Sequence, residues 1–417
     1  MQEGIFRGLK VVDCASYIAA PAAAVVLGDF GADVIKIEPL SGDAFRQVHT
    51  KPATPVSDVD YATMMVGRNK RSVALDLSSD EGRDILYKIV ADADVFITNF
   101  PLPARRKLGL EYDDLRKNNE RLIYASFTAY GEVGPEANKA GFDTTAYWAR
   151  SGLMDIVRAD AEAPPARAAT GMGDHPCAMN LYAAIVTALY QRQQTGRGCK
   201  VNTSLLAGGM WANGILAQAK LVNATFPPRP PRERATNALS NLYKCRDGRW
   251  LSLAMSNPAR EFVPFLKIIG REDLASSEKF GTPEARTKNA HELIALFDTV
   301  FATRDLVEWR AVLDAARITF GFVGTLGDIA DDQQMKAANV VVPRHGAPGL
   351  TINSPFEIEG LRKAAPGPAP AIGEHTTEVL SALGYAQRDI DRLAEQQKIG
   401  VASVPDTPQR QMASARK

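Results

Sequence analysis

The first 38 residues are predicted to alternate between strand and helix, an order of elements that few folds can accommodate. Leu9–Asp13 is a short apolar run that predicts a strand, and Asp33–Glu38 is a second run of this kind. Between them, residues 21–31 (PAAAVVLGDFG) begin with proline and end with glycine, which is typical of a complete helix. A strand, a helix and a second strand in this order form a βαβ unit with parallel strands. The chain is therefore predicted to have an α/β fold built on a parallel sheet.

The alternation continues along the chain. Further strands are predicted at Ser72–Leu77, Val95–Asn99 and Leu122–Phe127, and helices at Asp80–Ala91 and around Asp113–Asn118. Because an open α/β sheet binds its ligand at the carboxyl ends of its strands, we expect the site in the segments that follow them. Those segments are Cys14–Ala20, Pro39–Asp43, Asn99–Pro101 and Thr128–Gly131. No G-x-G-x-x-G follows the first strand and no G-x-x-x-x-G-K-[ST] occurs, so neither a dinucleotide site nor a P-loop is predicted.

A proline-rich segment at 226–234 (FPPRPPRER) divides the chain and is typical of a linker. After it, Asp247-Gly248 stands between two apolar runs and predicts a β-hairpin, and amphipathic helices follow to about Asp331. The predicted organisation is therefore as follows: the first part of a large α/β domain at 1–225, a linker and a smaller α+β domain at 226–335, a return to the large domain at 336–400, and a flexible tail at 401–417.

Composition narrows the classes of function. The 49 Lys and Arg almost balance the 48 Asp and Glu, which argues against a nucleic-acid partner, because such proteins bind phosphates through excess positive charge. No apolar run reaches the roughly 18 residues that span a bilayer, so no membrane is expected either. The N-terminus lacks the pattern of a signal peptide, and the four cysteines are scattered, which predicts reduced thiols in a cytoplasmic protein. Neither the cysteines nor the five histidines show metal-ligand spacing, so no metal site is predicted.

The stretch Gly171–Leu206 presents one acidic residue at the start of a long apolar run. Asp174 comes directly before the run Cys177–Tyr190, which predicts a helix buried on most sides. Asp174 is expected at the N-cap of this helix, ionised and held at the positive end of the helix dipole. A carboxylate in that place is either a good cap or a nucleophile, and the pattern alone supports both.

Two basic clusters lie beside predicted strands. Arg68, Lys70 and Arg71 precede one strand, and Arg105–Lys107 follow another. Together they could hold a phosphorylated ligand through charge-assisted hydrogen bonds, although a run of charges is also typical of a solvated surface. The residues by themselves thus indicate an α/β enzyme that binds a small phosphorylated ligand.

In addition, the sequence resembles the family III CoA-transferases, the group of formyl-CoA transferase and carnitine CoA-transferase. The matching stretches follow one another over nearly the whole chain: residues 8–46, 69–77 (NKRSVALDL), 96–110 (FITNFPLPARRKLGL), 130–135 (YGEVGP), 173–206 with its TGRG and SLL, and 373–393 (GEHTTEVLSALGYAQRDIDRL). The resemblance implies a large Rossmann-like domain, a smaller α+β domain, and two chains threaded through each other as an interlocked homodimer.

The resemblance also implies the reaction, the movement of CoA from an acyl-CoA donor to a small carboxylic acid acceptor. Asp174 would attack the thioester and form an aspartyl anhydride, the CoA thiolate would return to form an aspartyl-CoA thioester, and the acceptor would then take the CoA. CoA is a substrate in this scheme and not a permanently bound cofactor. The residues expected along CoA are Tyr17, Ala19, Lys70, Arg71, Asn99, Phe100 and Lys107, with Tyr130 near the thioester.

Some positions depart from the patterns of related enzymes. Ile18 stands where formyl-CoA transferases carry glutamine, and residues 235–245 (ATNALSNLYKC) replace their glycine-rich lid, which argues against formyl or oxalyl substrates. α-Methylacyl-CoA racemases share the fold and the aspartate but add a histidine in a G-H-D stretch, where this chain has Phe142. Phenylalanine cannot carry a proton, so transfer is favoured unless His175 or another group serves as second base. The alternatives are a racemase-like isomerase, an intramolecular CoA transferase and a non-catalytic acyl-CoA-binding protein.

The segment 142–154 (FDTTAYWARSGLM) resembles family members that act on larger organic acids, such as aryl or 2-hydroxy acids. Tyr147, Trp148 and Met154 either line an acyl pocket or belong to the core as one face of an amphipathic helix. The donor and acceptor acids themselves are not predicted.

Overall fold

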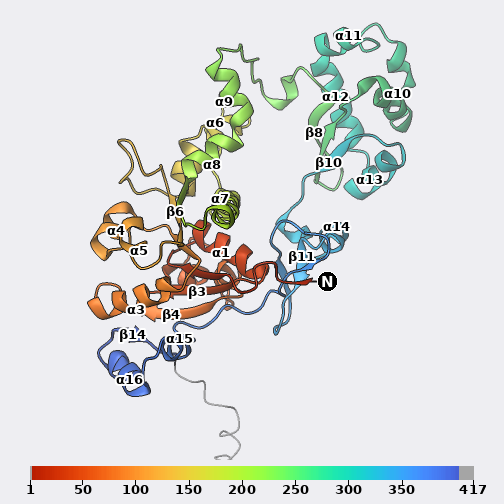
Figure 1. The fold of residues 1–417 in the computed structure, drawn as a ribbon. Coiled ribbons are helices and arrows are strands. Elements are labelled where there is room, and N and C mark those ends of the chain that lie inside the picture. Colours follow the sequence, from red (N-terminus) through yellow and green to blue (C-terminus); the bar gives the residue numbers. More distant parts are fainter. Residues whose placement is uncertain (1, 403–417) are drawn as a thin grey trace, which may run out of the picture. The chain divides into compact units, whose positions relative to one another are not determined.

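The structure is a computed structural model that describes residues 2–402, and it divides into two compact units (Figure 1). The first unit takes in the chain up to Leu153, Ala168–Ala217 and the residues from Gln333 on. The second takes in Met154–Arg167 and Gln218–Asp332. Residues 154–167, which we expected in the large domain, thus belong to the second unit. Residues 403–417 of the predicted tail lie outside the described residues.

A seven-stranded sheet forms the centre of the first unit. Its order is β14-β4-β3-β2-β5-β6-β7, and all neighbouring strands are parallel except β14, which is antiparallel to β4. The strands are β2 (Lys10–Asp13), β3 (Asp33–Glu38), β4 (Arg71–Leu75), β5 (Val95–Thr98), β6 (Ile123–Thr128), β7 (Lys200–Ser204) and β14 (Ile399–Gly400). Without β14 this is the order of a Rossmann-like sheet, in which the winding reverses between β2 and β5. The predicted α/β fold on a parallel sheet is confirmed.

Helices cover both faces of this sheet. Val11 in β2 packs into one core and Val12 into the other, because successive side chains of a strand point to opposite faces. The first core contains residues of α1 (Ala19–Asp29) and α7 (Asp174–Thr195). The second contains residues of α3 (Asp80–Ala91), α15 (Thr376–Ala382) and α16 (Gln387–Glu395). Burial on both faces explains why these strands are short apolar runs without polar alternation.

Helices α1 and α7 differ in how far they are buried. Every residue of α1 is buried, and its many alanines allow neighbouring elements to come close. In α7 the buried residues form one stripe that includes Leu181, Ile185 and Ala188, whereas Tyr190 on another face is 65% exposed. The prediction that this helix is buried on most sides is therefore wrong for the single chain. Tyr182 and Leu189 beside the stripe are partly buried against the same core.

The first unit also contains shorter strands and helices. Two small sheets pair β1 (Gln2–Glu3) with β13 (Leu361–Arg362) and β11 (Val341–Pro343) with β12 (Leu350–Ile352). The helices are η1 (Ala44–Thr50), α2 (Tyr61–Val66), α4 (Leu102–Leu108), α5 (Tyr112–Leu115), the π-helix η2 (Asp143–Ala149), α8 (Leu205–Ala212) and α14 (Gln333–Ala337). Helices α6 (Leu153–Ile156) and α9 (Gly214–Leu221) contain the points at which the chain passes from one unit to the other.

The second unit is α+β, as predicted. Strands β8 (Ser240–Lys244), β9 (Trp250–Ala254) and β10 (Phe320–Phe322) form an antiparallel sheet, and the β8–β9 hairpin turns at Gly248 with φ +81°. Its helices are η3 (Arg232–Arg234), α10 (Pro258–Ile268), η4 (Glu272–Ser276), α11 (Pro283–Lys288), α12 (Ala290–Phe301), α13 (Leu306–Ala315) and η5 (Leu326–Asp328). The core is rich in aromatic rings, and the ring of Phe301 lies 4.8 Å from that of Tyr243 and 4.9 Å from that of Trp309. Among residues 2–402, no helix is long and apolar enough to cross a membrane.

Candidate active site

The loops that follow β2 and β5 are joined at the carboxyl edge of the sheet by Asn99. Its side-chain Oδ1 accepts a hydrogen bond from the Ser16 N–H at 2.9 Å, and its Nδ2 donates to the Ser16 carbonyl at 2.7 Å. The amide group therefore pairs with the backbone of the first loop as a neighbouring strand would. Asn99, which we expected along CoA, thus lies at this edge and fixes the loop that begins after β2.

Asp43, which follows β3, holds the same loop from another side. Its Oδ1 accepts hydrogen bonds from the Ser16 hydroxyl at 2.8 Å and from the Tyr17 N–H at 3.4 Å, and its Oδ2 pairs with Lys36 Nζ at 2.9 Å. Burial acts to raise the pKa of Asp43, but Lys36 and the donated hydrogen bonds outweigh it and hold that pKa below its usual value. Asp43 is therefore a fixed anion that orders the loop.

Tyr17 adopts an unusual backbone conformation in this loop. Its φ is +63°, in the left-handed region that costs a residue other than glycine about 1 kcal/mol. Such strain persists where surrounding contacts determine the conformation, and the contacts of Asn99 and Asp43 do so here. The Tyr17 side chain is 43% exposed, and the buried Ala19 begins α1 two residues later.

A cavity of about 670 Å³ opens at this edge of the sheet. Its lining includes Phe100 after β5, Leu108 at the end of α4, and Leu75–Ser78 at the end of β4. This is the crevice at the carboxyl ends of the strands in which open α/β sheets bind ligands, and its volume suits a small-molecule site. Phe100 was expected at CoA, but residues 75–78 were not. The predicted strand runs to Leu77, whereas β4 ends at Leu75. The residues that follow Leu75 therefore belong to a loop at the carboxyl edge and not to the strand.

Three of the six basic side chains predicted to bind phosphate, those of Arg68, Lys70 and Arg105, are buried in the protein. Lys70 is fully buried, and its Nζ donates to Asp13 Oδ2 at 2.7 Å and to the carbonyls of Pro21 at 2.8 Å and Val66 at 2.7 Å. Burial lowers the pKa of Lys70 to about 8. All three of its hydrogens are engaged inside the fold, so the expected role of Lys70 at a phosphate does not agree with this geometry.

Arg71 lies at the opposite edge of the sheet from the cavity. It is the first residue of β4, and its guanidinium pairs with Asp33 at 2.5 Å and with Glu378 at 3.0 Å. In a parallel sheet the first residues of the strands lie at the amino edge, away from the carboxyl edge. The expectation that Arg71 binds CoA phosphates is therefore corrected as well.

Arg68 and Arg105 are buried in internal ion pairs. Arg68 pairs with Asp29 at 2.8 Å, and Arg105 pairs with Glu132 at 2.6 Å while donating to the carbonyl of Phe100 at 2.6 Å. Arg106 and Lys107 are exposed. Arg106 pairs with Glu111 at 3.3 Å, whereas the side chain of Lys107 forms no hydrogen bond or ion pair with any of residues 2–402. Lys107 directly precedes Leu108, which lines the cavity.

Asp174 is the first residue of α7, and Gly173 is the N-cap, so the aspartate does not cap the helix as expected. No side chain makes the capping hydrogen bond. A Cβ at position 173 would lie 2.5 Å from the ring of Tyr147, which means that the chain needs glycine there. Tyr147 is buried beneath the start of the helix and thus belongs to the core, one of the two roles left open for it.

The carboxyl group of Asp174 has a neighbour of like charge. Asp143, the first residue of the π-helix η2, is buried and accepts a hydrogen bond from the Gly173 N–H at 3.2 Å. Burial, and then the charge of Asp143, raise the pKa of Asp174 to about 7. We expected an ionised carboxylate, but near neutral pH the group is instead about half protonated. A carboxyl pKa near neutrality is characteristic of catalytic groups.

The loop before η2 completes the surroundings of Asp174. Gly141 packs so closely on half-buried Tyr130 that a Cβ there would lie 2.7 Å from the ring. Tyr130, which we expected near the thioester, thus lies against the segment that carries Phe142 and Asp143. The exposed side chain of His175 makes no hydrogen bond to any residue that the structure describes. No group of three or more His, Cys, Asp or Glu among those residues is arranged for a metal ion.

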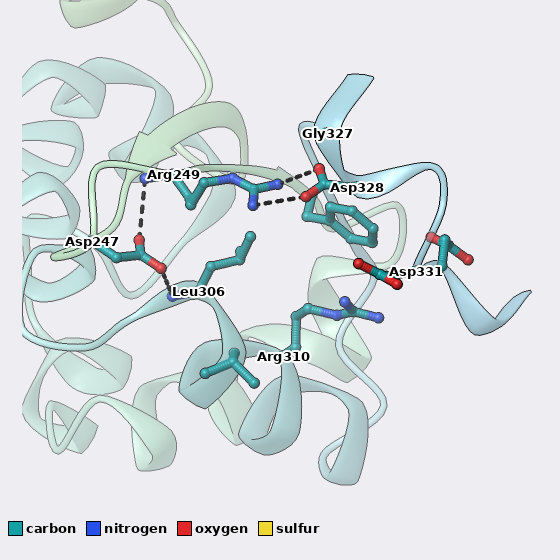
Figure 2. Close-up of a pocket in the computed structure, with 10 residues that line it drawn as sticks. Asp247, Arg249, Leu306, Arg310, Gly327, Asp328 and Asp331 are labelled. Carbon is teal, nitrogen blue, oxygen red and sulfur yellow. Dashed lines mark hydrogen bonds and ion pairs between the residues drawn. The ribbon is translucent and has the colours of Figure 1, made fainter. Parts of the chain in front are cut away.

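A second hollow, of about 320 Å³, lies within the second unit (Figure 2). Arg249 pairs with both carboxylate oxygens of Asp328, at 3.2 and 2.8 Å. Asp247 accepts hydrogen bonds from the backbone N–H groups of Arg249 and Leu306, both at 3.1 Å. These charged groups satisfy one another and stabilise the unit, so the carboxyl edge of the large sheet remains the candidate active site.

A family model described as CoA-transferase family III matches residues 6–376. The chain belongs to this family. It is therefore a CoA-transferase, an enzyme that moves CoA between acyl-CoA donors and carboxylic acid acceptors.

Several known proteins resemble this CoA-transferase over nearly its whole length. The (R)-2-hydroxy-4-methylpentanoate CoA-transferase of Clostridioides difficile is 34% identical, with 94% of this chain and 98% of the relative aligned. The cinnamoyl-CoA:phenyllactate CoA-transferase of Clostridium sporogenes is 32% identical, with 95% and 98% aligned. A crystal structure of a CAIB/BAIF family protein from Brucella suis superposes with a TM-score of 0.82 at 29% identity, covering 92% of this chain and all of the other.

Proposed function

We propose that this CoA-transferase carries the acyl group on Asp174. The observation that supports the proposal is the position of Asp174 as the first residue of α7, with a pKa raised to about 7 by burial and by Asp143. A partly desolvated carboxylate is a stronger nucleophile than a solvated one, and the amide N–H groups at a helix start can stabilise negative charge on a thioester oxygen. Both features favour attack by Asp174.

The reaction proceeds in four exchanges. An oxygen of the ionised Asp174 attacks the thioester carbonyl carbon, the carbon–sulfur bond breaks, and an aspartyl anhydride and CoA thiolate result. The thiolate attacks the aspartyl carbonyl of the anhydride, releases the donor acid as a carboxylate and leaves an aspartyl-CoA thioester. The acceptor carboxylate attacks this thioester, expels the CoA thiolate and forms a second anhydride. The thiolate then attacks the acceptor's carbonyl in this anhydride, which forms the product acyl-CoA and frees Asp174 as a carboxylate. No proton is transferred in any step, so the chemistry needs an ionised Asp174 and exclusion of water.

The nucleotide part of CoA would lie in the cavity at the carboxyl edge, against Phe100 and residues 75–78. Exposed Lys107 beside it supplies positive charge for a phosphate. The rest of CoA would follow the ordered loop from Ser16 to Ala19, with Tyr17 exposed along it, toward Tyr130 and Asp174. The names of two relatives, which include a branched and an aromatic 2-hydroxy acid, support an acceptor with a larger side chain.

We also propose that the enzyme is an interlocked homodimer. Trp211 in α8 is 84% exposed, and in α9 Ile215 is 87% and Leu221 is 77% exposed. Large apolar side chains gathered on consecutive helices are typical of a surface that another chain covers. The four cysteines are free thiols, and three of them are buried, which fits a cytoplasmic enzyme.

The test of the mechanism is a comparison of two aspartates at the same place in a helix. Asp80 is the first residue of α3 as Asp174 is of α7, but its side chain is 89% exposed. We expect Asp174→Ala to abolish CoA transfer and Asp80→Ala to leave it unchanged. With an acyl-CoA and hydroxylamine present, mass spectrometry should find a hydroxamate at Asp174 in the wild-type enzyme. Full transfer activity of Asp174→Ala would overturn the proposal.

A further inference from the structure

Phe142 is a large apolar side chain that is exposed to solvent, in the segment that is hydrogen-bonded to the start of α7. It is 63% exposed, although phenylalanine is among the residues most often buried. The next residue, Asp143, is hydrogen-bonded to the Gly173 N–H at 3.2 Å, and Asp174 follows Gly173. Phe142 thus directly precedes Asp143, whose carboxylate is hydrogen-bonded at the start of α7. Its exposed ring is an apolar surface on the segment that is hydrogen-bonded to the start of α7.

The backbone of Phe142 is rigidly held. Its N–H donates to the Thr145 hydroxyl oxygen at 2.9 Å, and its carbonyl accepts a hydrogen bond from the Ala146 N–H at 2.8 Å. Gly141 before it is packed on the ring of Tyr130. Phe142 also caps the π-helix η2, a rare form of helix that is frequent at functional sites. An exposed apolar ring on a fixed backbone is preorganised to receive a ligand and not simply a loose surface side chain.

Tyr17 provides the second ring. The centroids of Tyr17 and Phe142 are 6.2 Å apart with the planes at 72°, an edge-to-face contact. The centroid of the Tyr17 ring also lies 6.1 Å from that of buried Phe45. The backbone of Tyr17 is held in its left-handed conformation by Asp43. Two rings from separate loops therefore contact each other, the backbone of each is hydrogen-bonded, and both are exposed to solvent.

We propose that Phe142 and Tyr17 form an apolar wall that receives the side chain of the acyl group carried on Asp174. The inference rests on the proposed function, in which Asp174 is the nucleophile. It makes Phe142 a specificity-determining residue and names the preferred substrates as acids with an aromatic or branched apolar side chain. An aromatic substrate side chain can stack on or meet the edge of these rings, whereas a methyl group covers little of them.

The experiment compares two acceptors that differ only in the side chain, 3-phenyllactate and lactate, with acetyl-CoA as donor. We expect Phe142→Ala to lower the ratio of kcat/KM for phenyllactate to kcat/KM for lactate by about tenfold or more, because differences in apolar contact discriminate substrates by such factors. Phe142→Leu keeps an apolar surface and should restore part of the ratio. Val307→Ala, at an exposed valine of the second unit, is the control and should leave the ratio unchanged. Equal loss for both acids, or a ratio changed less than about twofold, would overturn the inference.

A binding measurement separates this inference from the proposed mechanism. The full chain with Asp174→Asn cannot form the anhydride, so the dissociation constants of phenyllactyl-CoA and lactyl-CoA can be measured without turnover. Adding Phe142→Ala should weaken binding of phenyllactyl-CoA about tenfold and that of lactyl-CoA little. If Asp174→Ala retains activity but this affinity difference is found, the proposed mechanism is wrong and the apolar wall is supported. If the two affinities change alike, the wall fails whatever the mechanism.

Discussion

The carboxylate of Asp143 accepts a hydrogen bond from the backbone N–H of Gly173 at 3.2 Å, directly before Asp174. The bond ties the π-helix η2 to the start of α7 and places two carboxyl groups close together in a partly buried site. The charge of Asp143 adds to burial in raising the pKa of Asp174. Asp143 therefore acts on Asp174, the proposed nucleophile, through charge and position.

This relationship predicts a pH dependence. With the pKa of Asp174 near 7, the ionised nucleophile accumulates as pH rises, so kcat/KM of the wild-type enzyme should increase through about pH 7 and then level off. Asp143→Asn retains an oxygen that can accept from Gly173 but removes the charge. We expect the midpoint of the profile to move to lower pH, by roughly one unit or less. The measurement is kcat/KM between pH 5 and 9, and an unmoved midpoint would contradict the coupling.

The raised pKa of Asp174 also predicts a cost in stability. The folded state holds this proton up to about pH 7, whereas the unfolded chain releases it near pH 4, so the group destabilises the fold increasingly as pH rises between these values. Asp174→Asn should therefore raise the thermal unfolding temperature at pH 8 and have little effect at pH 4.

Asp43 serves as the control for this measurement, because its substitution should change the unfolding temperature at pH 8 in the opposite direction. Its pKa is lowered in the fold, so its contribution to stability is present above the unfolded pKa and is lost as pH falls through the folded value. Asp43→Asn should lower the unfolding temperature at pH 8. A stability gap for Asp174→Asn that did not grow with pH would be inconsistent with the pKa assigned to it.

The two lysines once expected at the phosphates should now behave differently. Lys70→Met removes the partner of buried Asp13, which should reduce the free energy of unfolding by about 3–5 kcal/mol. Lys107→Ala should leave stability unchanged, raise KM for acyl-CoA and weaken its dependence on salt, because an exposed cation is lost. Denaturant unfolding and KM at low and high salt test both outcomes. A Lys70→Met enzyme of normal stability with a raised KM would reverse these roles.

Phe142 in place of histidine predicts that the enzyme does not exchange the α-proton of its substrate. In D2O, a 2-methylacyl-CoA incubated with the wild-type protein should gain no deuterium at the α-carbon while CoA transfer proceeds. Mass spectrometry of the recovered thioester is the measurement. Incorporation at the rate of turnover would reveal a second base and support the racemase alternative.

The exposed apolar side chains of α8 and α9 predict that two chains associate through this surface. One charged substitution there should weaken the association. Trp211→Asp should lower the molar mass measured by light scattering from that of a dimer, because a charged group is costly to bury without a partner. Leu326→Asp, at a side chain that is 88% exposed in the second unit, is the matched control. A monomeric wild-type protein, or a dimer unaffected by Trp211→Asp, would argue against this surface.

The sequence by itself determined the α/β fold, the α+β character of the second unit and the loops that carry the site. Strands buried on both faces must be apolar throughout, so runs such as Asp33–Glu38 and Val95–Asn99 are visible in the local sequence. Parallel strands also share one carboxyl edge, so the loops after them could be placed together before any contact was known. The proposal that Asp174 is the nucleophile came from its setting in the sequence and from the family resemblance, and it stays a prediction.

Only the tertiary structure decided what the charged side chains do. Whether Lys70 faces a ligand or pairs with Asp13 depends on residues 57 positions away in the chain, and nothing in the local sequence distinguishes the two. The same holds for Asp143, which meets Gly173 across 30 residues and helps to set the pKa of Asp174. Apolar periodicity is a local property of strands and helices, whereas burial, charge pairing and pKa arise from neighbours that folding brings together.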